Sequence, residues 1–228
     1  HDVLSVFDGV CATAGERFEM EAWGADVYLA ASQKAIGLPP GLALLVAGER
    51  ALKAREARAH PPPLSFDWHS WIPVMKAYEA RRPAYFATPP TNLVLALRAG
   101  LGEILTDGME ARFALHERGA GALRAAWSAM SLRQVPARDG NAAHTMSALY
   151  YPAGVDASLV SRVAERGVLV APGLHPAIRE RYFRVGHMGF ALTRADMLMR
   201  TVEAIGGALE ASGHAVDTER AVRAMLAA

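Results

Sequence analysis

The sequence predicts an α/β protein in which a partial parallel or mixed sheet belongs to one large domain and a small α/β domain follows. Short apolar runs alternate with segments of helical periodicity, which is the pattern of an α/β fold. Hydrophobic residues make up 52% of the 228 residues, so the chain can bury a substantial core. A helical stretch that begins at Thr91 separates the two groups of runs. We therefore expect residues 1–105 to belong to the large domain and residues 106–228 to form the small one.

Three apolar runs in the first part are expected to be buried strands of one sheet. They are short and are bounded by turn residues such as the Pro-Pro-Gly sequence at positions 39–41. A charged helix is expected next, and the prolines at positions 61–63 then enforce an extended connection to a loop or partner-facing excursion. The expected strands cover residues 3–7, 27–30 and 42–47, the helix covers residues 49–58, and the excursion covers residues 68–78.

The sequence pattern of the second part predicts two long helices followed by a compact α/β domain. Leucine and isoleucine residues recur at helical intervals between positions 93 and 105, and a helix at 109–130 bridges into the small domain. Short apolar runs and amphipathic segments alternate after it. The expected strands cover residues 147–151, 168–171 and 182–186, and the expected helices cover residues 156–166, 194–212 and 218–227.

The charge balance and the single cysteine exclude several classes of function. Lys and Arg number 24 against 23 Asp and Glu, so no general attraction to nucleic acid or to an anionic membrane is expected. No apolar run approaches the roughly 20 residues that cross a bilayer, and the eight histidines show no metal-binding spacing. Cys11 is the only cysteine, so we expect a small buried hydrophobe in a reducing, intracellular compartment, whether cytoplasmic, peroxisomal or mitochondrial.

Lys34 and Asp8 together give the first indication of chemistry. Each follows an apolar run, and ligands of open α/β sheets gather outside the carboxyl ends of the strands. A lysine that forms a Schiff base needs a constrained loop, and an acid at a strand end can keep a pyridinium nitrogen protonated. The pair therefore suggests a pyridoxal phosphate site. Taken alone, the lysine would more often be a surface charge, and Asp8-Gly9 a turn or a helix cap.

Four segments, in order along the chain, resemble landmarks of the alanine:glyoxylate aminotransferases. These enzymes are class V members of the fold type I pyridoxal phosphate-dependent family, and the resemblance, closest to fungal members, runs from the first residues to about Gly206. It implies that the chain is the C-terminal part of such an enzyme, because the glycine-rich phosphate loop and the stacking aromatic residue lie upstream of Asp8 in relatives. The segments are Phe7-Asp8-Gly9-Val10-Cys11-Ala12, Ser32-Gln33-Lys34-Ala35, Tyr85-Phe86-Ala87-Thr88-Pro89-Pro90 and Arg184-Val185-Gly186-His187-Met188-Gly189.

Three residues of the first two segments are implied to bind the cofactor. Lys34 matches the Schiff base lysine, which also moves the α-proton of the substrate. Asp8 matches the carboxylate that pairs with the pyridine nitrogen. Gln33 matches a residue beside the cofactor phosphate, where an amide can donate to an oxygen; a solvated loop glutamine is the alternative.

The other two segments are implied to supply the partner contact and the substrate contact. Tyr85 and Thr88 match a pair of hydroxyls that reach the cofactor phosphate of the neighbouring subunit in a homodimer with shared active sites, although Tyr85 could instead pack into the core. Arg184 matches the arginine that binds the α-carboxylate of the substrate, although a structural carboxylate could serve as its partner. His187 is expected to be a packing residue.

The resemblance implies transamination between alanine and glyoxylate, which yields pyruvate and glycine. A serine:glyoxylate or serine:pyruvate aminotransferase is the nearest alternative, and a noncatalytic binding or dimerisation module is an alternative of another class. A cysteine desulfurase is disfavoured because Cys11 lies only three residues after Asp8. Because the upstream half of the site is expected to be missing, we expect the 228 residues alone to be inactive.

Overall fold

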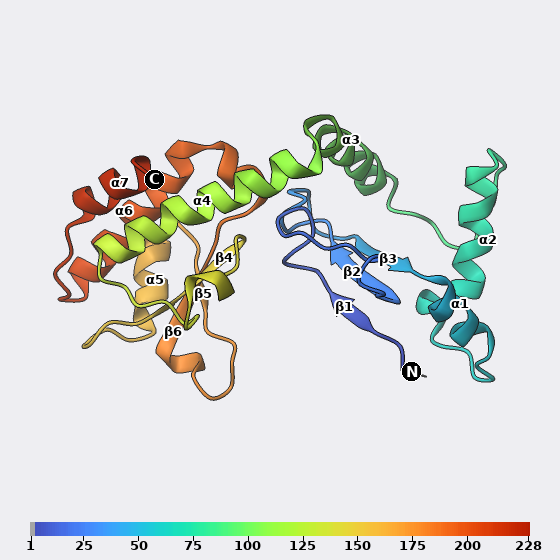
Figure 1. Ribbon diagram of the computed structural model, residues 1–228, viewed down its shortest axis with the longest axis horizontal. Coiled ribbons are helices and arrows are strands. Elements are labelled where there is room, and N and C mark those ends of the chain that lie inside the picture. Colours follow the sequence, from blue (N-terminus) through green and yellow to red (C-terminus); the bar gives the residue numbers. More distant parts are fainter. Residues whose placement is uncertain (1–2) are drawn as a thin grey trace.

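The computed structural model describes residues 3–228 as two lobes connected by the long helix α4 (Met109–Ala129), as Figure 1 shows. Each lobe contains one three-stranded sheet. The first lobe consists of β1 (Val6–Asp8), β2 (Val27–Ala31), β3 (Ala43–Ala47), α1 (Glu49–Glu56), α2 (Trp68–Glu79) and α3 (Thr91–Asp107). The second lobe consists of α4 and of β4 (Met146–Tyr150), α5 (Ser158–Glu165), β5 (Ala171–Pro172), β6 (Tyr182–Gly186), α6 (Ala195–Ala211) and α7 (Thr218–Leu226).

The first sheet is mixed, with the strand order β1-β2-β3. β1 pairs in parallel with β2, so that Asp8 lies opposite Leu29, whereas β2 and β3 are antiparallel, with Ala31 opposite Ala43. The expected mixed sheet is therefore confirmed. The parallel pair fixes a single edge of the sheet at which β1 and β2 both end.

Two of the three predicted buried strands are not buried. All three residues of β1 are exposed and β3 is only partly covered, whereas Val27 and Ala30 of β2 are buried. The expectation was wrong for β1 and β3 because, within the described residues, nothing pairs with the second edge of β1. β1 also begins later than predicted, at Val6, because the Ser5 N–H donates to the Asp26 carboxylate at 2.8 Å and only the Ser5 carbonyl bonds to β2, accepting from the Val27 N–H at 3.0 Å.

Cys11 is exposed, which contradicts the expectation of a buried thiol. It lies in the turn after β1, where the backbone N–H groups of Ala12 and Thr13 donate to the Gly9 carbonyl. Gly9 itself packs on the Tyr28 ring, where any Cβ would lie 2.0 Å from ring atoms. The turn therefore buries its glycine and leaves its cysteine outside.

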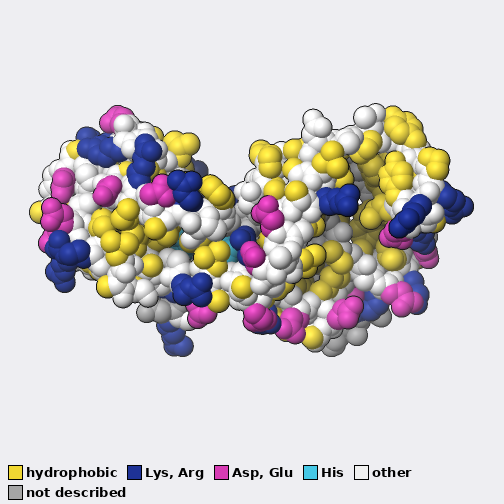
Figure 2. Space-filling model, turned by 90° about the horizontal axis from the view of Figure 1, so that it is seen from above, with side chains coloured by type: hydrophobic (Ala, Val, Ile, Leu, Met, Phe, Trp, Pro, Cys, Tyr) yellow, Lys and Arg dark blue, Asp and Glu magenta, His cyan; other side chains and the backbone are white. Residues whose placement is uncertain are grey.

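The segment after the proline cluster is a projecting helix rather than a loop. α2 contains no buried residue and stands out from the sheet at the right of Figure 1. Its start is fixed by Asp67, which accepts from the His69 N–H and pairs with Arg55 at 2.7 Å. Figure 2 shows hydrophobic side chains gathered on the surface of this lobe. Exposed large apolar residues on α2 and α3 are Met75, Tyr78, Val94, Leu95, Leu101 and Leu105.

The second lobe has a continuous apolar core. β6 is the central strand of an antiparallel sheet with the order β4-β6-β5, and α4, α5, α6 and α7 contribute buried side chains to the core. Leu123 and Trp127 lie one turn apart on α4, so both face the same side. Each large side chain that is buried here contributes about 1.5–3 kcal/mol. The predicted strand at 168–171 is reduced to the two residues of β5. Fully buried members include Leu123, Trp127, Leu149, Leu159, Phe183, Ile205 and Leu209.

A buried polar chain crosses this core. The Trp127 indole donates to Ser147 Oγ at 3.0 Å, and Ser147 Oγ lies 2.9 Å from His187 Nε2. His187 is only 1% exposed, which agrees with the expected packing role. Burial, and to a smaller extent the nearby Arg124, lower the pKa of His187 to about 4. The imidazole is therefore neutral at pH 7.

Acidification is expected to destabilise the second lobe through His187. The pKa of this group falls from 6.5 in the unfolded chain to about 4 in the folded chain, so the unfolded chain takes up the proton first as the pH falls below 6.5. Between pH 6.5 and 4.5 the free energy of unfolding should fall by about 2–3 kcal/mol from this group alone. Urea denaturation followed by circular dichroism measures this change.

The matched variants are His187→Gln, which removes the titration, and His60→Gln, which changes an exposed histidine. His187→Gln should flatten the pH dependence by the stated amount, whereas His60→Gln should leave it unchanged. An identical slope in all three proteins would contradict the assignment.

Candidate active site

Asp8 and the Lys34 loop lie at the same edge of the first sheet. Asp8 is the last residue of β1, and Ser32 directly follows the last residue of β2. Because these two strands are parallel neighbours, their carboxyl ends lie side by side. The structure therefore brings together the two residues that suggested the site.

The loop that carries Lys34 is held closed by Ser32. The buried Ser32 hydroxyl donates to the Pro39 carbonyl at 2.7 Å, and the Ser32 carbonyl accepts from the Leu38 N–H at 3.0 Å. Gly37 has a φ of +83° and donates from its N–H to the Lys34 carbonyl at 2.8 Å, which makes a tight turn. Lys34 is half-buried. A constrained amine of this kind suits covalent attachment of a carbonyl compound.

The carboxylate of Asp8 is exposed but oriented. Its Oδ1 accepts a hydrogen bond from the Val10 N–H at 2.9 Å, which fixes the side chain over the turn after β1. An exposed carboxylate so held can meet a cationic group of a ligand. Gln33, next to Lys34, is exposed as well, so its amide can donate to a ligand oxygen.

Arg184 lies at the middle of β6 and has no acidic partner among residues 3–228. Its Nε donates to the Pro172 carbonyl at 2.9 Å, across the β5-β6 pair. None of the ion pairs among the described residues includes Arg184, so the alternative in which a structural carboxylate pairs with it is wrong for this part of the chain. A guanidinium held through Nε can present its terminal nitrogens to a carboxylate in two parallel hydrogen bonds.

The segment that follows the Arg184-bearing strand β6 packs onto the Lys34 loop through two glycines. Gly189 has a φ of +62°, and a Cβ on it would lie 3.1 Å from Gly37 Cα and 3.2 Å from the Lys34 carbonyl oxygen. Only glycine allows the two backbones to approach so closely. This contact connects the two lobes at the site.

Two residues of α4 that the sequence analysis did not single out hold this junction. Arg112 Nη2 donates to the Ala35 carbonyl at 2.7 Å, and His116 Nε2 accepts from the Gly189 N–H at 3.2 Å. Both side chains are buried, and burial lowers the pKa of each. The signal that could have found them is the spacing of four between a basic residue and a histidine on one apolar helix face.

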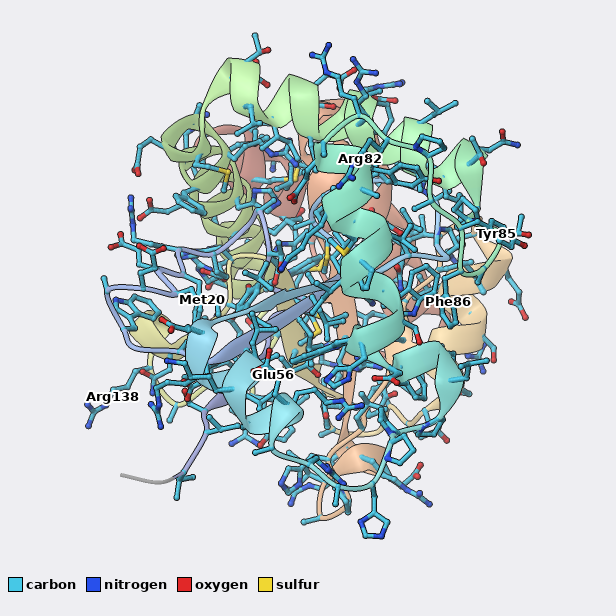
Figure 3. The ribbon with its side chains drawn as sticks, turned by 90° about the vertical axis from the view of Figure 1, so that its right-hand side faces the viewer. Met20, Glu56, Arg82, Tyr85, Phe86 and Arg138 are labelled. Atoms are coloured by element: carbon cyan, nitrogen blue, oxygen red, sulfur yellow. The ribbon has the colours of Figure 1, made fainter. Side chains whose placement is uncertain are left out.

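Tyr85 and Thr88 lie apart from this junction, on the connection between α2 and α3. Tyr85 is 74% exposed, and its hydroxyl is 2.9 Å from Thr88 Oγ1. Figure 3 places Tyr85 at the outer edge of the molecule, with Phe86 beside α2. The Phe86 ring packs edge-on against Trp71, with centroids 5.1 Å apart. Phe86 thus anchors the segment, and the alternative in which Tyr85 packs into the core is wrong.

No group of three or more His, Cys, Asp and Glu side chains in residues 3–228 could hold a metal ion. No helix in the same part of the chain is long and apolar enough to cross a membrane.

Comparisons with known proteins agree with this geometry, although no protein-family model matches the chain. The chain is 35% identical over 193 residues to alanine–glyoxylate aminotransferase 1 of Saccharomyces cerevisiae, covering 82% of this chain and 50% of that protein. It is 36% identical over 199 residues to L-aspartate–glyoxylate aminotransferase of Paracoccus denitrificans, covering 87% and 48%. It is 32% identical over 191 residues to serine–glyoxylate aminotransferase of Arabidopsis thaliana, covering 83% and 46%.

Solved structures show the same relationship. Pyridoxamine–pyruvate aminotransferase of Mesorhizobium loti superposes with a TM-score of 0.88 at 28% identity, over 99% of this chain and 57% of that one. The chain thus spans about half the length of the relatives it matches. It has the fold of the fold type I, pyridoxal phosphate-dependent aminotransferases, and over that half of their length it is similar in sequence to members of the class V group.

Proposed function

We propose that this chain is the part of a glyoxylate aminotransferase that supplies the cofactor lysine, the ring acid and the substrate arginine. The observation that carries the proposal is the contact of Gly189, in the segment that follows the Arg184-bearing strand β6, with the loop that carries Lys34 beside Asp8. We infer that this contact brings the Arg184 guanidinium, which has no acidic partner among the described residues, toward the sheet edge where the Lys34 amine and the Asp8 carboxylate lie. The printed names of three relatives, all glyoxylate aminotransferases, support the acceptor.

The residues present fit pyridoxal phosphate. The Lys34 amine would hold it covalently, Asp8 would pair with its ring nitrogen, and the Gln33 amide would donate to its phosphate. When bound, the cofactor supplies an electron sink for the electron pair that is left when the α-proton of the substrate departs.

The protein side chains would do the remaining work. Arg184 would bind the α-carboxylate of the amino acid with two parallel hydrogen bonds and so fix the direction of its Cα–H bond. Lys34 Nζ, once displaced from the cofactor, would accept the α-proton and return it to the oxo acid in the second half of the reaction. Asp8 would keep the proton on the ring nitrogen throughout.

Alanine is the donor that we propose, with serine and aspartate as alternatives. The order of the four sequence landmarks and the similarity to the yeast protein support alanine. The similarity to the Arabidopsis and Paracoccus proteins supports the other two. The three donors differ only beyond Cβ, so all of them would use Arg184 in the same way.

We further propose a homodimer in which Tyr85 and Thr88 serve the neighbouring site. Both hydroxyls are exposed on a segment that is stiffened by Pro89 and Pro90 and anchored by Phe86. The exposed apolar surface of α2 and α3 would be covered by the second subunit or by the rest of the large domain. A noncatalytic module is the second candidate, and the exposed strands β1 and β3 favour it for the 228 residues alone.

Lys34→Ala should abolish covalent cofactor binding in the full-length protein. We expect borohydride to fix the cofactor on Lys34 and not on Lys53 or Lys76, the two other lysines. Peptide mass mapping locates the adduct. Turnover should fall at least about 10³-fold, because both attachment and proton transfer are lost. Lys53→Ala, on the exposed face of α1, is the control that should keep both. An adduct that persists in Lys34→Ala would overturn the proposed function.

Donor preference is expected to follow the order alanine, then serine or aspartate. We expect kcat/KM to be at least about 10-fold higher for alanine, because a hydroxyl or a second carboxylate must be desolvated in a pocket built for a methyl group. Initial rates with glyoxylate measure the difference. Arg184→Lys should lower kcat/KM by a similar factor for all three donors, since they share the α-carboxylate. A higher value for serine or aspartate in the unaltered protein would reassign the donor.

Mixed dimers should show whether Tyr85 acts on the partner's site. A dimer of one Tyr85→Phe subunit and one Lys34→Ala subunit holds one intact site if Tyr85 acts across the interface, and none if it acts within its own chain. We expect the cofactor dissociation constant of the borohydride-fixable site to match the unaltered protein in this heterodimer, and to be roughly 10-fold weaker in the Tyr85→Phe homodimer. Equal weakening in both would contradict the shared site.

A further inference from the structure

We propose that His116 is a positioning residue that sets the separation between the Lys34 loop and the strand carrying Arg184. The inference rests on the proposed transamination, in which a substrate is held at one end by the lysine-borne cofactor and at the other by Arg184. A reaction that needs both contacts depends on the distance between them. His116 lies where that distance is fixed.

Two chain segments that follow the site strands meet the His116 ring, and a third lies beside them. Gly189, after β6, donates its N–H to His116 Nε2 at 3.2 Å. Gly15, after β1, is so close that a Cβ on it would lie 3.0 Å from His116 Cδ2 and 3.2 Å from Ala35 Cβ. Ala35 directly follows Lys34 in the loop after β2. The ring therefore touches or borders the segments downstream of Asp8, Lys34 and Arg184.

The hydrogen bonds of His116 determine its protonation state. The Gly189 N–H can only donate, so Nε2 must be the acceptor and carries no proton. Nδ1 then bears the proton and donates to the Arg112 carbonyl at 2.8 Å. Because the side chain is fully buried, no water replaces either bond. His116 is thus neutral, has one defined tautomer and connects α4 to the segment after β6 through its hydrogen bond with Gly189.

α4 transmits this constraint to the lysine loop. Arg112 lies one turn before His116, and its Nη2 donates to the Ala35 carbonyl at 2.7 Å. One helix therefore holds the lysine loop through Arg112 and the β6 strand end through His116. The glycine contact between positions 37 and 189 closes the same junction from the opposite side.

The test uses three variants of the full-length protein. His116→Leu removes the acceptor, and His116→Gln keeps an acceptor oxygen that can reach the Gly189 N–H. Leu123→Ala is the matched control, because it removes a fully buried side chain from the same helix without contact to the lysine loop. The measurements are KM and kcat, the cofactor dissociation constant, and the hydrogen exchange rate of the Gly189 amide.

We expect His116→Leu to raise KM for the amino donor and the oxo acid by about 10-fold or more, and kcat/KM to fall by up to about 100-fold. Cofactor affinity should change less than about twofold, because Asp8, Gln33 and Lys34 keep their places. His116→Gln should restore most of the loss. Exchange of the Gly189 amide should speed up in His116→Leu and not in Leu123→Ala.

Gly189→Ala is the second test, should His116→Leu fail to fold. A methyl group there would push the two backbones apart while His116 stays in place, so KM should rise in the same way. The inference is overturned if His116→Leu changes KM no more than Leu123→Ala does, or if Gln does not rescue it. A parent protein that neither binds cofactor nor turns over would instead overturn the proposed function on which the inference rests.

Discussion

The close approach of Gly37 and Gly189 is the constraint on which the arrangement of the site depends. A side chain at position 189 would press the segment after β6 away from the loop after β2, because its Cβ would lie 3.1 Å from Gly37 Cα. Positive φ values at both residues let the backbones meet without strain. Lys34, Asp8 and Arg184, the three residues that the proposed chemistry needs most, are all carried by these two segments or by the strands β1 and β6 that adjoin the junction.

The polar groups at this contact are costly to bury. Arg112 and His116 lose hydration inside the junction, where Arg112 donates to the Ala35 carbonyl of the first lobe and His116 accepts from the Gly189 N–H of the second. An apolar helix face could pack equally tightly, but it would not specify which carbonyl and which N–H it meets. The second lobe shows the contrast, since its core of Leu123, Trp127 and Phe183 needs only shape and volume.

The sequence predicted the elements of the second lobe closely, because its strands and helices bury one side against a core within the same chain. Periodicity therefore carried the information at α4 and α6. In the first lobe the same reasoning failed for β1 and β3, whose apolar residues are exposed in the described chain. Hydrophobicity predicts that a strand will be buried but cannot say by what.

In the candidate site, too, some residues could be predicted from the sequence and others could not. Lys34 and Asp8 could be predicted because strand-end positions on parallel neighbours converge, and the resemblance added Gln33, Tyr85, Thr88 and Arg184. Arg112 and His116 escaped notice because their partners are backbone atoms far away in sequence, which no local motif encodes. The prediction that Cys11 is buried was wrong because it rested on residue type alone, whereas the turn after β1 leaves this side chain exposed.

Because α4 is long, a small tilt of the helix at the junction displaces its far end by a larger distance. Its 21 residues extend about 30 Å, and Arg112 and His116 lie in the first half, close to the pivot between the lobes. A tilt of one degree about that point would move the far end by roughly 0.3–0.4 Å for a helix of this rise. A substitution that tilts α4 at Arg112 or His116 would therefore displace the end of the helix near Trp127 without touching any group that the proposed reaction uses. Selection on the alignment of the junction would then act on the packing of the second lobe's core as well.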